Sequence, residues 1–310
     1  MKLVAPGLVL CLAMAGCGDG VPFNQPEDEG PADTAIGSAY LTEENENLTA
    51  NNISYDPETD ELTINNIPFD DPNNTYVNIP SANFTTGFRA YQSDPEPGSN
   101  EFQYFAVFRR SDSGLSQVAA TQSNEYIQFG FGGAGAQRIQ GNTNLPETGI
   151  YSYTGDYAAV RVVRSQDEND VAVEELYLVK GGMEMTADFG DFDAEDNVRG
   201  AVGGVVRNRT IYTRSGELIG DLDGIISFAN SDISLEDGTI APNDAVELQG
   251  GVQTLNDGYQ GGEVTATGRW NGVFAGPGGE EIAGIVFVQG GEVREIGGVI
   301  VTCTSAACND

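Results

Sequence analysis

Two adjacent glutamates, Glu280 and Glu281, are the first residues of this sequence that could do chemistry. Paired carboxyl groups act as general acid and base, or as acid and nucleophile, when both flank one bond. These two lie in "GVFAGPGGEEIAGIVFV", 272–288, whose apolar runs predict two β-strands and a turn. Neighbouring side chains on a strand point to opposite faces, so the two carboxyl groups would not meet. We predict that the pair is not catalytic.

Nucleophilic catalysis is also disfavoured. A serine, threonine or cysteine nucleophile needs a base, usually histidine, and the chain has no histidine. Lys180 precedes Gly181 and Gly182, which predicts a surface charge in a turn. The "GPGG" segment is not followed by Lys-Ser/Thr or a helix start, so a phosphate loop is excluded. We expect no enzymatic activity and no cofactor.

Two acidic segments could offer oxygen ligands to calcium. Their acidic residues are Asp191, Asp193, Glu195 and Asp196 in "DFDAEDN", and Asp221 and Asp223 in "GDLDG". A helix–loop–helix calcium loop starting at Asp191 would need glycine at its sixth position and glutamate at its twelfth. The chain has Asp196 and Val202 there. We expect solvated acidic turns and no metal site, and the sequence leaves calcium binding by them open.

Charge narrows the possible partners. The 310 residues carry 47 Asp and Glu against 14 Lys and Arg, a formal net charge of −33. Nucleic-acid binding requires clustered basic residues that displace counterions from phosphates, so it is excluded. Electrostatic attachment to anionic lipid is disfavoured for the same reason.

The N-terminus has the pattern of an export signal. Lys2 is followed by an apolar stretch over 3–14, then by Ala15, Gly16 and Cys17. The stretch is shorter than the roughly 20 residues of a membrane-spanning helix, which favours a signal peptide over 1–16. It resembles a bacterial lipoprotein signal, which implies lipid attachment at Cys17. The alternative is an ordinary secretory signal cut near Ala15.

The two ends of the exported chain are predicted from composition. Residues 17–44 are rich in Gly, Pro and acid, which favours a flexible tether. At the other end, 303–310, Cys303 and Cys308 stand close together. Close cysteines in an exported protein most often form a disulfide, and we expect one to clasp the C-terminus after the last strand.

Between these ends the apolar residues alternate in short runs separated by turn-forming residues, and no helical period persists. This pattern predicts an all-β, antiparallel chain, with a polar boundary at 140–149 and a barrel or sandwich of about eight strands after it. Trp270, Gly272, Phe274 and Gly276 would share one face, because side chains on a strand repeat every two residues. Alternating small and large residues fill a narrow barrel, and short segments with acids in mid-strand favour a soluble one.

"YSYTGDY", "GGMEMTADF" and above all "NGVFAGPGGEEIAGIVFV" resemble the barrel domain of transferrin-binding protein B and related surface lipoproteins. The matching residues are Gly272, Phe274, Gly276, Pro277, Glu281 and Gly284. Ala283 stands where the first of two paired glycines is usual. The resemblance implies a β-rich handle domain over 45–140, a soluble eight-stranded barrel over 149–302 and a single lobe. The matched residues specify fold and do not identify a ligand.

The resemblance implies a lipid-anchored envelope protein that captures a protein or solute-bearing partner, one option being an accessory to an outer-membrane uptake receptor. The anchor would be its only membrane contact, and the protein would face the cell surface or the periplasm. The alternative is a structural or display lipoprotein without a specific ligand. Tyr126 precedes a glycine-rich segment and is the candidate partner-binding residue, whereas Phe129 and Phe131 are expected on one face of a core strand.

Overall fold

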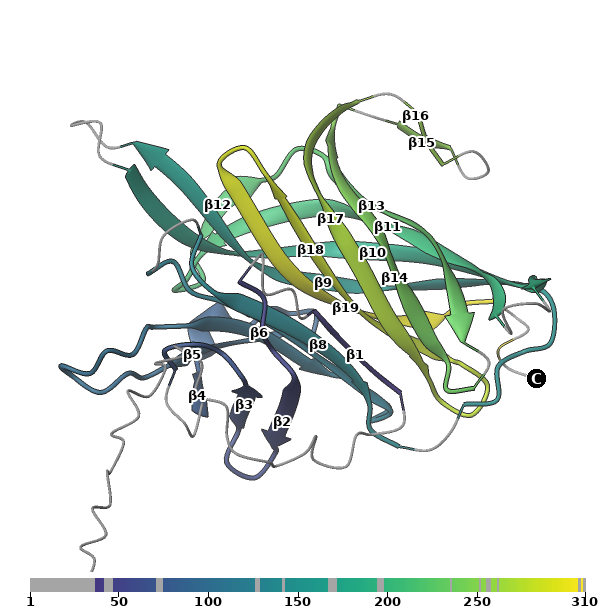
Figure 1. Ribbon diagram of the computed structural model, residues 1–310, viewed down its shortest axis with the longest axis horizontal. Helices are drawn as coiled ribbons and strands as arrows, with labels where there is room; N and C mark the ends of the chain where they lie inside the picture. Colours follow the sequence, from purple (N-terminus) through teal and green to yellow (C-terminus); the bar gives the residue numbers. More distant parts are fainter. Residues whose placement is uncertain are drawn as a thin grey trace, which may run out of the picture.

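The protein is an all-β chain, as the sequence predicts (Figure 1). The computed structural model describes residues 37–41, 47–70, 75–125, 129–140, 143–166, 172–193, 198–234, 236–250, 252–254, 258–260, 262–305 and 308. Within these ranges no helix is long and apolar enough to cross a bilayer. The expected signal peptide and Cys17 lie outside the described residues.

Eight antiparallel strands form a first sheet, here called the handle sheet. They are β1 (Ser38–Leu41), β2 (Asn52–Asp56), β3 (Glu61–Asn65), β4 (Thr75–Asn78), β5 (Arg89–Ser93), β6 (Phe105–Arg110), β7 (Ser116–Gln122) and β8 (Gly132–Arg138). Their spatial order is β1-β8-β7-β6-β5-β4-β3-β2, so every neighbouring pair except β1 and β8 is consecutive in the chain. A 3₁₀ turn, η2 (Pro80–Ala82), connects β4 to β5.

The second sheet closes on itself. Its strands are β9 (Ile150–Gln166), β10 (Ala172–Asp193), β11 (Val198–Thr213), β12 (Leu218–Asp221), β13 (Ile225–Ser234), β14 (Thr239–Gln249), β17 (Glu263–Ala275), β18 (Glu281–Gly290) and β19 (Val293–Cys303). Their order is β10-β9-β19-β18-β17-β14-β13-β11-β12, and β10 also pairs with β11. Within the described residues this second pairing closes a barrel of every strand but β12, which confirms the predicted fold. A separate two-stranded sheet joins β15 (Val252–Thr254) and β16 (Gly258–Gln260).

The interior of the barrel is filled with side chains. Its largest fully buried residue is Trp270, whose ring stacks on Phe228 with centroids 5.0 Å apart. Phe274 lies in the same interior cluster, two residues beyond Gly272 on that face of β17. A Cβ at Gly272 would lie 2.6 Å from the carbonyl oxygen of Ala283, closer than real Cβ contacts allow. The predicted alternation of large residues and glycine is therefore confirmed from Trp270 to Phe274, where it lets β17 and β18 approach closely, whereas Gly276 lies beyond the end of β17.

The handle sheet packs against the outer wall of the barrel (Figure 1). Strand β18 is buried on both faces because it lies between the barrel interior and the handle. Ile282 and Val286 face the interior, whereas Ile285 and Phe287 join Val118 and other handle residues in a second cluster. This double burial explains why "GIVFV" is continuously apolar and does not alternate with polar residues.

Buried polar contacts fix the orientation of the handle on the barrel. Arg138 of β8 is fully buried and donates from Nε to the carbonyl oxygen of Phe274 at 2.9 Å. Arg109 of β6 pairs with Asp156 of β9 at 2.8 Å. Directional contacts of this kind restrict sliding of one apolar surface over the other, so the two sheets form one packed body.

Three local predictions differ from the structure. Lys180 was expected in a turn, but it lies within β10, with its Nζ 5.3 Å from the ring centroid of Tyr212. Phe129 and Phe131 were expected on one face, but a φ of 72° at Phe129 breaks the alternation and they enter different clusters. Ser38–Leu41, within the expected tether, pairs with β8 as edge strand β1.

Candidate functional site

A bulge in β11 turns an arginine into the barrel. Opposite β10, Thr210 pairs with Lys180 and Arg207 pairs with Gly182, so β11 has one more residue than its partner between these pairs. Asn208 accommodates this extra residue by adopting a left-handed backbone conformation, with a φ of 51°. An inserted residue reverses which face the following side chains take, and Arg209 therefore points inward like Val206.

Arg209 joins a buried network of two arginines and two glutamates. Its terminal nitrogens donate to Glu247 and to Glu295, each at 2.6 Å. Arg161 of β9 donates to the same two carboxylates, at 3.1 Å and 2.5 Å. The hydroxyl of Tyr157 donates to the other oxygen of Glu295 at 2.5 Å. Two positive and two negative charges balance, so the network adds no net charge to the barrel interior.

The pKa values follow from burial and pairing. Burial disfavours the charged form of Arg209, but attraction to Glu295 and Glu247 outweighs it and raises the Arg209 pKa above its ordinary value. Burial likewise opposes the charged form of Glu295, yet Arg209 and Arg161 hold its pKa below the usual range. Burial, reinforced by Glu295, raises the pKa of Tyr157 well above that of an exposed tyrosine. Arg161, whose pKa the two glutamates also raise against the effect of burial, Arg209 and Glu295 therefore stay ionised at neutral pH.

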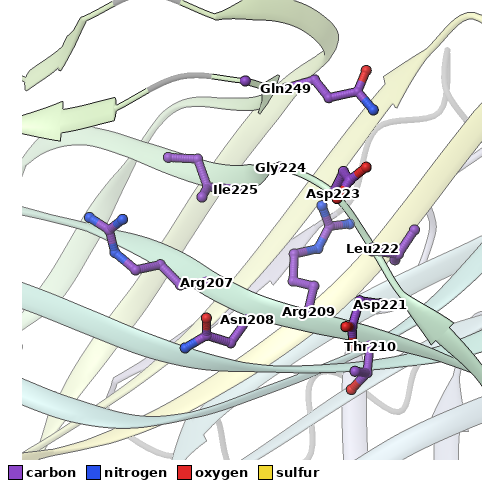
Figure 2. Close-up of a pocket in the computed structure, with 11 residues that line it drawn as sticks. Arg207, Asn208, Arg209, Thr210, Asp221, Leu222, Asp223, Gly224, Ile225 and Gln249 are labelled. Carbon is purple, nitrogen blue, oxygen red and sulfur yellow. The ribbon is translucent and has the colours of Figure 1, made fainter.

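A cavity of about 780 Å³ opens beside this network (Figure 2). Strands β12 and β13 both pair with β11, one after the other along its length. The cavity forms in the gap between them, around 222–224. Its lining residues are Arg207, Asn208, Arg209, Thr210, Asp221, Leu222, Asp223, Gly224, Ile225, Gln249 and Gly250. The segment "GELIGDLDGIISFA" is divided into β12 and β13, and this division creates the cavity, here called the rim pocket.

The rim pocket lies at one end of the barrel, here called the pocket rim. Strand registers place the ends of β9, β14 and β18 at this end, together with the starts of β10, β17 and β19. Exposed large apolar side chains gather there, namely Val173, Leu218, Ile219 and Val264. The exposed acidic residues of this end are Glu175, Glu217, Asp221, Asp223, Glu263 and Glu292. The pocket rim thus combines apolar surface, negative charge and an open cavity.

The predicted motif residues lie towards the opposite end, in the β17–β18 turn and on the parts of β17 and β18 next to it. Gly276 and Gly279 have φ values of 90° and 74°, which suit glycine in a tight turn. The buried carboxylate of Glu281 accepts hydrogen bonds from the hydroxyls of Ser113 and Ser116, in and beside the β6–β7 turn of the handle. Glu281 therefore ties handle to barrel. Glu280 instead accepts from the Gly278 amide, so the structure does not bring the two glutamates together over a substrate.

The other predicted residues are distributed as follows. Cys303, the last residue of β19, forms a disulfide with Cys308. Tyr126 and Cys17 lie outside the described residues. In the part of the chain that the structure describes, no three acidic or cysteine side chains cluster to hold a metal ion. Asp221 and Asp223 border the rim pocket, and Glu195 and Asp196 fall outside the described ranges.

Neither the buried network nor the pocket was predicted from the sequence. The inward direction of Arg161 could have been predicted. It follows Tyr157 and Ala159 at intervals of two residues in "YAAVRVV", so it lies on the same, interior face of the strand. For Arg209 no such signal existed, because strict alternation from Val206 puts Asn208 inward. Only the bulge, which depends on the neighbouring strands, makes Arg209 the inward residue.

Fold and site together define a class of protein, a closed antiparallel barrel with a strand-rich handle on its wall and an open polar pocket at one rim. The chain is similar in fold to transferrin-binding protein B of Haemophilus parasuis, in a double mutant, with 14% identity, 86% of this chain covered and a TM-score of 0.40. It is also similar to an intact transferrin-binding protein B with N and C lobes (11% identity, 82% covered, TM-score 0.39). A surface lipoprotein structure has 12% identity over 88% of this chain and all of its own, with a TM-score of 0.36.

The chain spans about 45% of the length of that Haemophilus protein and 46% of the two-lobed one. No protein-family model and no curated protein sequence matches it.

Proposed function

We propose that this protein is a lipid-anchored envelope protein that captures a protein partner at its pocket rim. The observation that carries the proposal is the pair Leu218 and Ile219, adjacent on β12 and 64% and 52% exposed. Successive strand residues point to opposite faces, so both faces of β12 are apolar and open to solvent. Exposed, clustered apolar side chains rimmed by polar groups are typical of protein-binding surfaces.

Strand β12 is presented on a rigid support. In the turn before it, Gly216 lies so close to the handle that a Cβ there would be 2.1 Å from the carbonyl oxygen of Ser81. The guanidinium of Arg214 covers the ring of Phe105, and Tyr212 contacts Phe84. The handle therefore holds the β11–β12 hairpin in place, which lowers the entropy lost when a partner binds.

The chemistry of the rim indicates the kind of partner. Because the barrel interior is filled by its own side chains, a macromolecule must bind the outer surface. Exposed acidic residues surround β12, and the chain carries a net charge of −33. A partner surface with basic residues around an apolar centre would complement this rim and associate faster at low salt.

The test compares two variants of the full chain in quantitative pull-down and surface plasmon resonance with candidate envelope and extracellular proteins. Leu218→Asp/Ile219→Asp is expected to weaken saturable binding at least about tenfold, as for the loss of a central hot spot. Ile150→Asp is the matched control, because Ile150 is 67% exposed but lies at the start of β9, at the end of the barrel opposite the pocket rim. Equal loss in both variants, or no saturable partner, would contradict the proposal and favour a display role.

Anchoring is a separate part of the proposal and is supported by sequence alone. Signal peptidase would cut before Cys17, lipid would attach there, and the following segment would tether the handle to the membrane at up to ~3.3 Å per residue. Metabolic labelling with a radioactive fatty acid should mark the wild-type protein and not Cys17→Ala. Label retained by that variant would refute lipid attachment at this cysteine.

A further inference from the structure

The barrel closes by the pairing of β10 with β11, and β12 lies outside this closure. Among the described strands, β12 pairs with β11 alone and stands at the end of the strand order. The chain that follows β14 does not cover the other side of β12, because β15 and β16 lie well apart from it in Figure 1. Within the part of the chain that the structure describes, β12 therefore has an unpaired edge at the pocket rim.

The hydrogen bonds between β11 and β12 show which backbone groups point outward from this edge. The Leu222 amide donates to the carbonyl oxygen of Arg209 at 2.8 Å, so these two residues form a hydrogen-bonded pair of the antiparallel ladder. Such pairs alternate with pairs whose N–H and C=O groups face away from each other. Asp221, opposite Thr210, is the next residue along β12, so its N–H and C=O groups point outward. An extended chain lying beside β12 would bond to both groups.

The rim pocket provides space beside this edge. Asp221 and Leu222 line one side of the cavity, and Gln249 and Gly250, at and just beyond the end of β14, line another. Figure 2 shows Gln249 and Asp221 apart across the pocket. Open space, and not a neighbouring strand, therefore separates β12 from the end of β14, and a strand added along β12 would have one end at the pocket.

The side chains of β12 leave its edge unprotected. Proteins commonly block exposed strand edges with lysine or proline, and the sequence of β12, "LIGD", contains neither. Its first two residues, Leu218 and Ile219, are large, apolar and exposed, whereas β1 and β2, the edges of the handle sheet, contain no exposed large apolar residue. Ile219 is an extra residue opposite β11, so the regular part of the edge is short. The edge thus suits a short extended segment.

Charge determines what kind of segment fits. Glu217, Asp221 and Asp223 are exposed on or beside β12, and none of them belongs to an ion pair of the described residues. The nearby arginines are engaged elsewhere, since Arg214 covers the ring of Phe105 and Arg207 lies 3.6 Å from Glu184. A segment with lysine or arginine between its apolar residues complements this surface.

From these observations we infer that β12 binds an extended, basic and apolar segment of the protein partner as an added β-strand. Backbone bonds to Asp221 would hold the segment, its apolar side chains would contact Leu218 and Ile219, and its basic side chains would lie near Glu217 and Asp223. Backbone bonds of this kind supply affinity, and alternate side chains supply specificity. The inference rests on the proposed function, because it specifies how the pocket rim captures its partner.

The first test titrates the purified full chain into fluorescently labelled Ac-KVRVKVRV-NH2 and follows anisotropy. Saturable binding is expected. The same peptide with N-methyl groups on its two central residues keeps its charge but cannot form strand bonds along either edge, so its Kd should be at least about tenfold higher. The acidic peptide Ac-EVDVEVDV-NH2 should bind at least about tenfold more weakly as well. No saturable binding of the basic peptide, or equal binding of either control peptide, overturns the inference.

The second test changes the edge itself. Asp221→Pro and Asp221→Asn both remove the charge, but only proline removes the outward N–H, and proline is tolerated on edge strands. The Kd of the basic peptide should be at least about tenfold higher for Asp221→Pro than for Asp221→Asn. In wild type, bound peptide should slow hydrogen exchange of the Asp221 amide, measured by NMR. Equal Kd values for the two variants overturn the inference, and the peptide controls decide it if Asp221→Pro does not fold.

Two further outcomes are distinguishable. A wild-type dimer that becomes a monomer in Asp221→Pro, measured by sedimentation, would assign the edge to a second copy of the chain and overturn the inference. Partner capture that is weakened by Leu218→Asp/Ile219→Asp but equal in Asp221→Pro and Asp221→Asn would mean docking by side chains alone. The proposed function would then stand, and strand addition would be refuted.

Discussion

Arg209→Met is expected to lower the free energy of unfolding by about 3–5 kcal/mol, the usual cost of removing one partner from a buried ion pair. The guanidinium binds both Glu247 and Glu295, so its loss leaves Arg161 to neutralise two carboxylates in the barrel interior. Urea unfolding measures the change, followed by the fluorescence of Trp270, the single tryptophan of the chain.

Two comparisons separate the network from a general effect of losing arginine. Arg207→Met removes a partly exposed neighbour, 3.6 Å from Glu184, and should cost less than about 1 kcal/mol. Replacing all four charges, with methionine for the arginines and leucine for the glutamates, should recover much of the loss, because no unpaired charge then remains buried. An Arg209→Met protein as stable as Arg207→Met would refute the structural role of the network.

The pH dependence of this difference has a defined sign. Attraction to the arginines outweighs burial and lowers the pKa of Glu295 in the folded state. Its stabilising contribution is therefore present above the ordinary glutamate pKa of about 4.3 and is lost as the pH falls through the lower folded value. The stability gap between wild type and Arg209→Met should thus be full at pH 7 and narrow under acidic conditions.

The sequence predicts the fold of this protein better than its site, for a physical reason. Alternation along a strand is a local property, so the shared interior face of Trp270 and Phe274 can be read from neighbouring residues. Glu281 was recognisable as a motif residue, but its role in binding Ser113 and Ser116 joins residues more than 160 positions apart. Only the packing of the two sheets reveals that contact.

The site depends on departures from alternation. Asn208 looks like any other polar residue of "VVRNRT", yet its left-handed backbone decides that Arg209 faces inward. The break between β12 and β13 is similarly hidden, because "GDLDG" was interpreted as acids within a strand and as a possible calcium segment. Bulges and strand breaks are set by the neighbouring strands, and they are where this barrel places its polar pocket.

Trp270→Ala is the second large effect that we expect, with a loss of about 3–5 kcal/mol in the free energy of unfolding. The side chain is fully buried, stacks on Phe228 and donates from its indole nitrogen to the carbonyl oxygen of Ala229 at 2.9 Å. Alanine would leave a cavity in the barrel interior and an unpaired carbonyl oxygen. Gly268 and Gly272, which have no side chain, flank the site on β17 and cannot fill the space.

Because the substitution removes the fluorophore, circular dichroism during urea unfolding is the suitable measurement. Trp270→Phe serves as the matched control: it keeps an aromatic ring against Phe228 and loses only the indole hydrogen bond and part of the volume. Its cost should be about 1–3 kcal/mol, clearly less than that of alanine. Equal stability of the two variants would contradict the structure, because it would mean that the ring of Trp270 does not fill the barrel interior. The alternation of large and small residues from Trp270 to Phe274 would then not explain the packing of this face of β17.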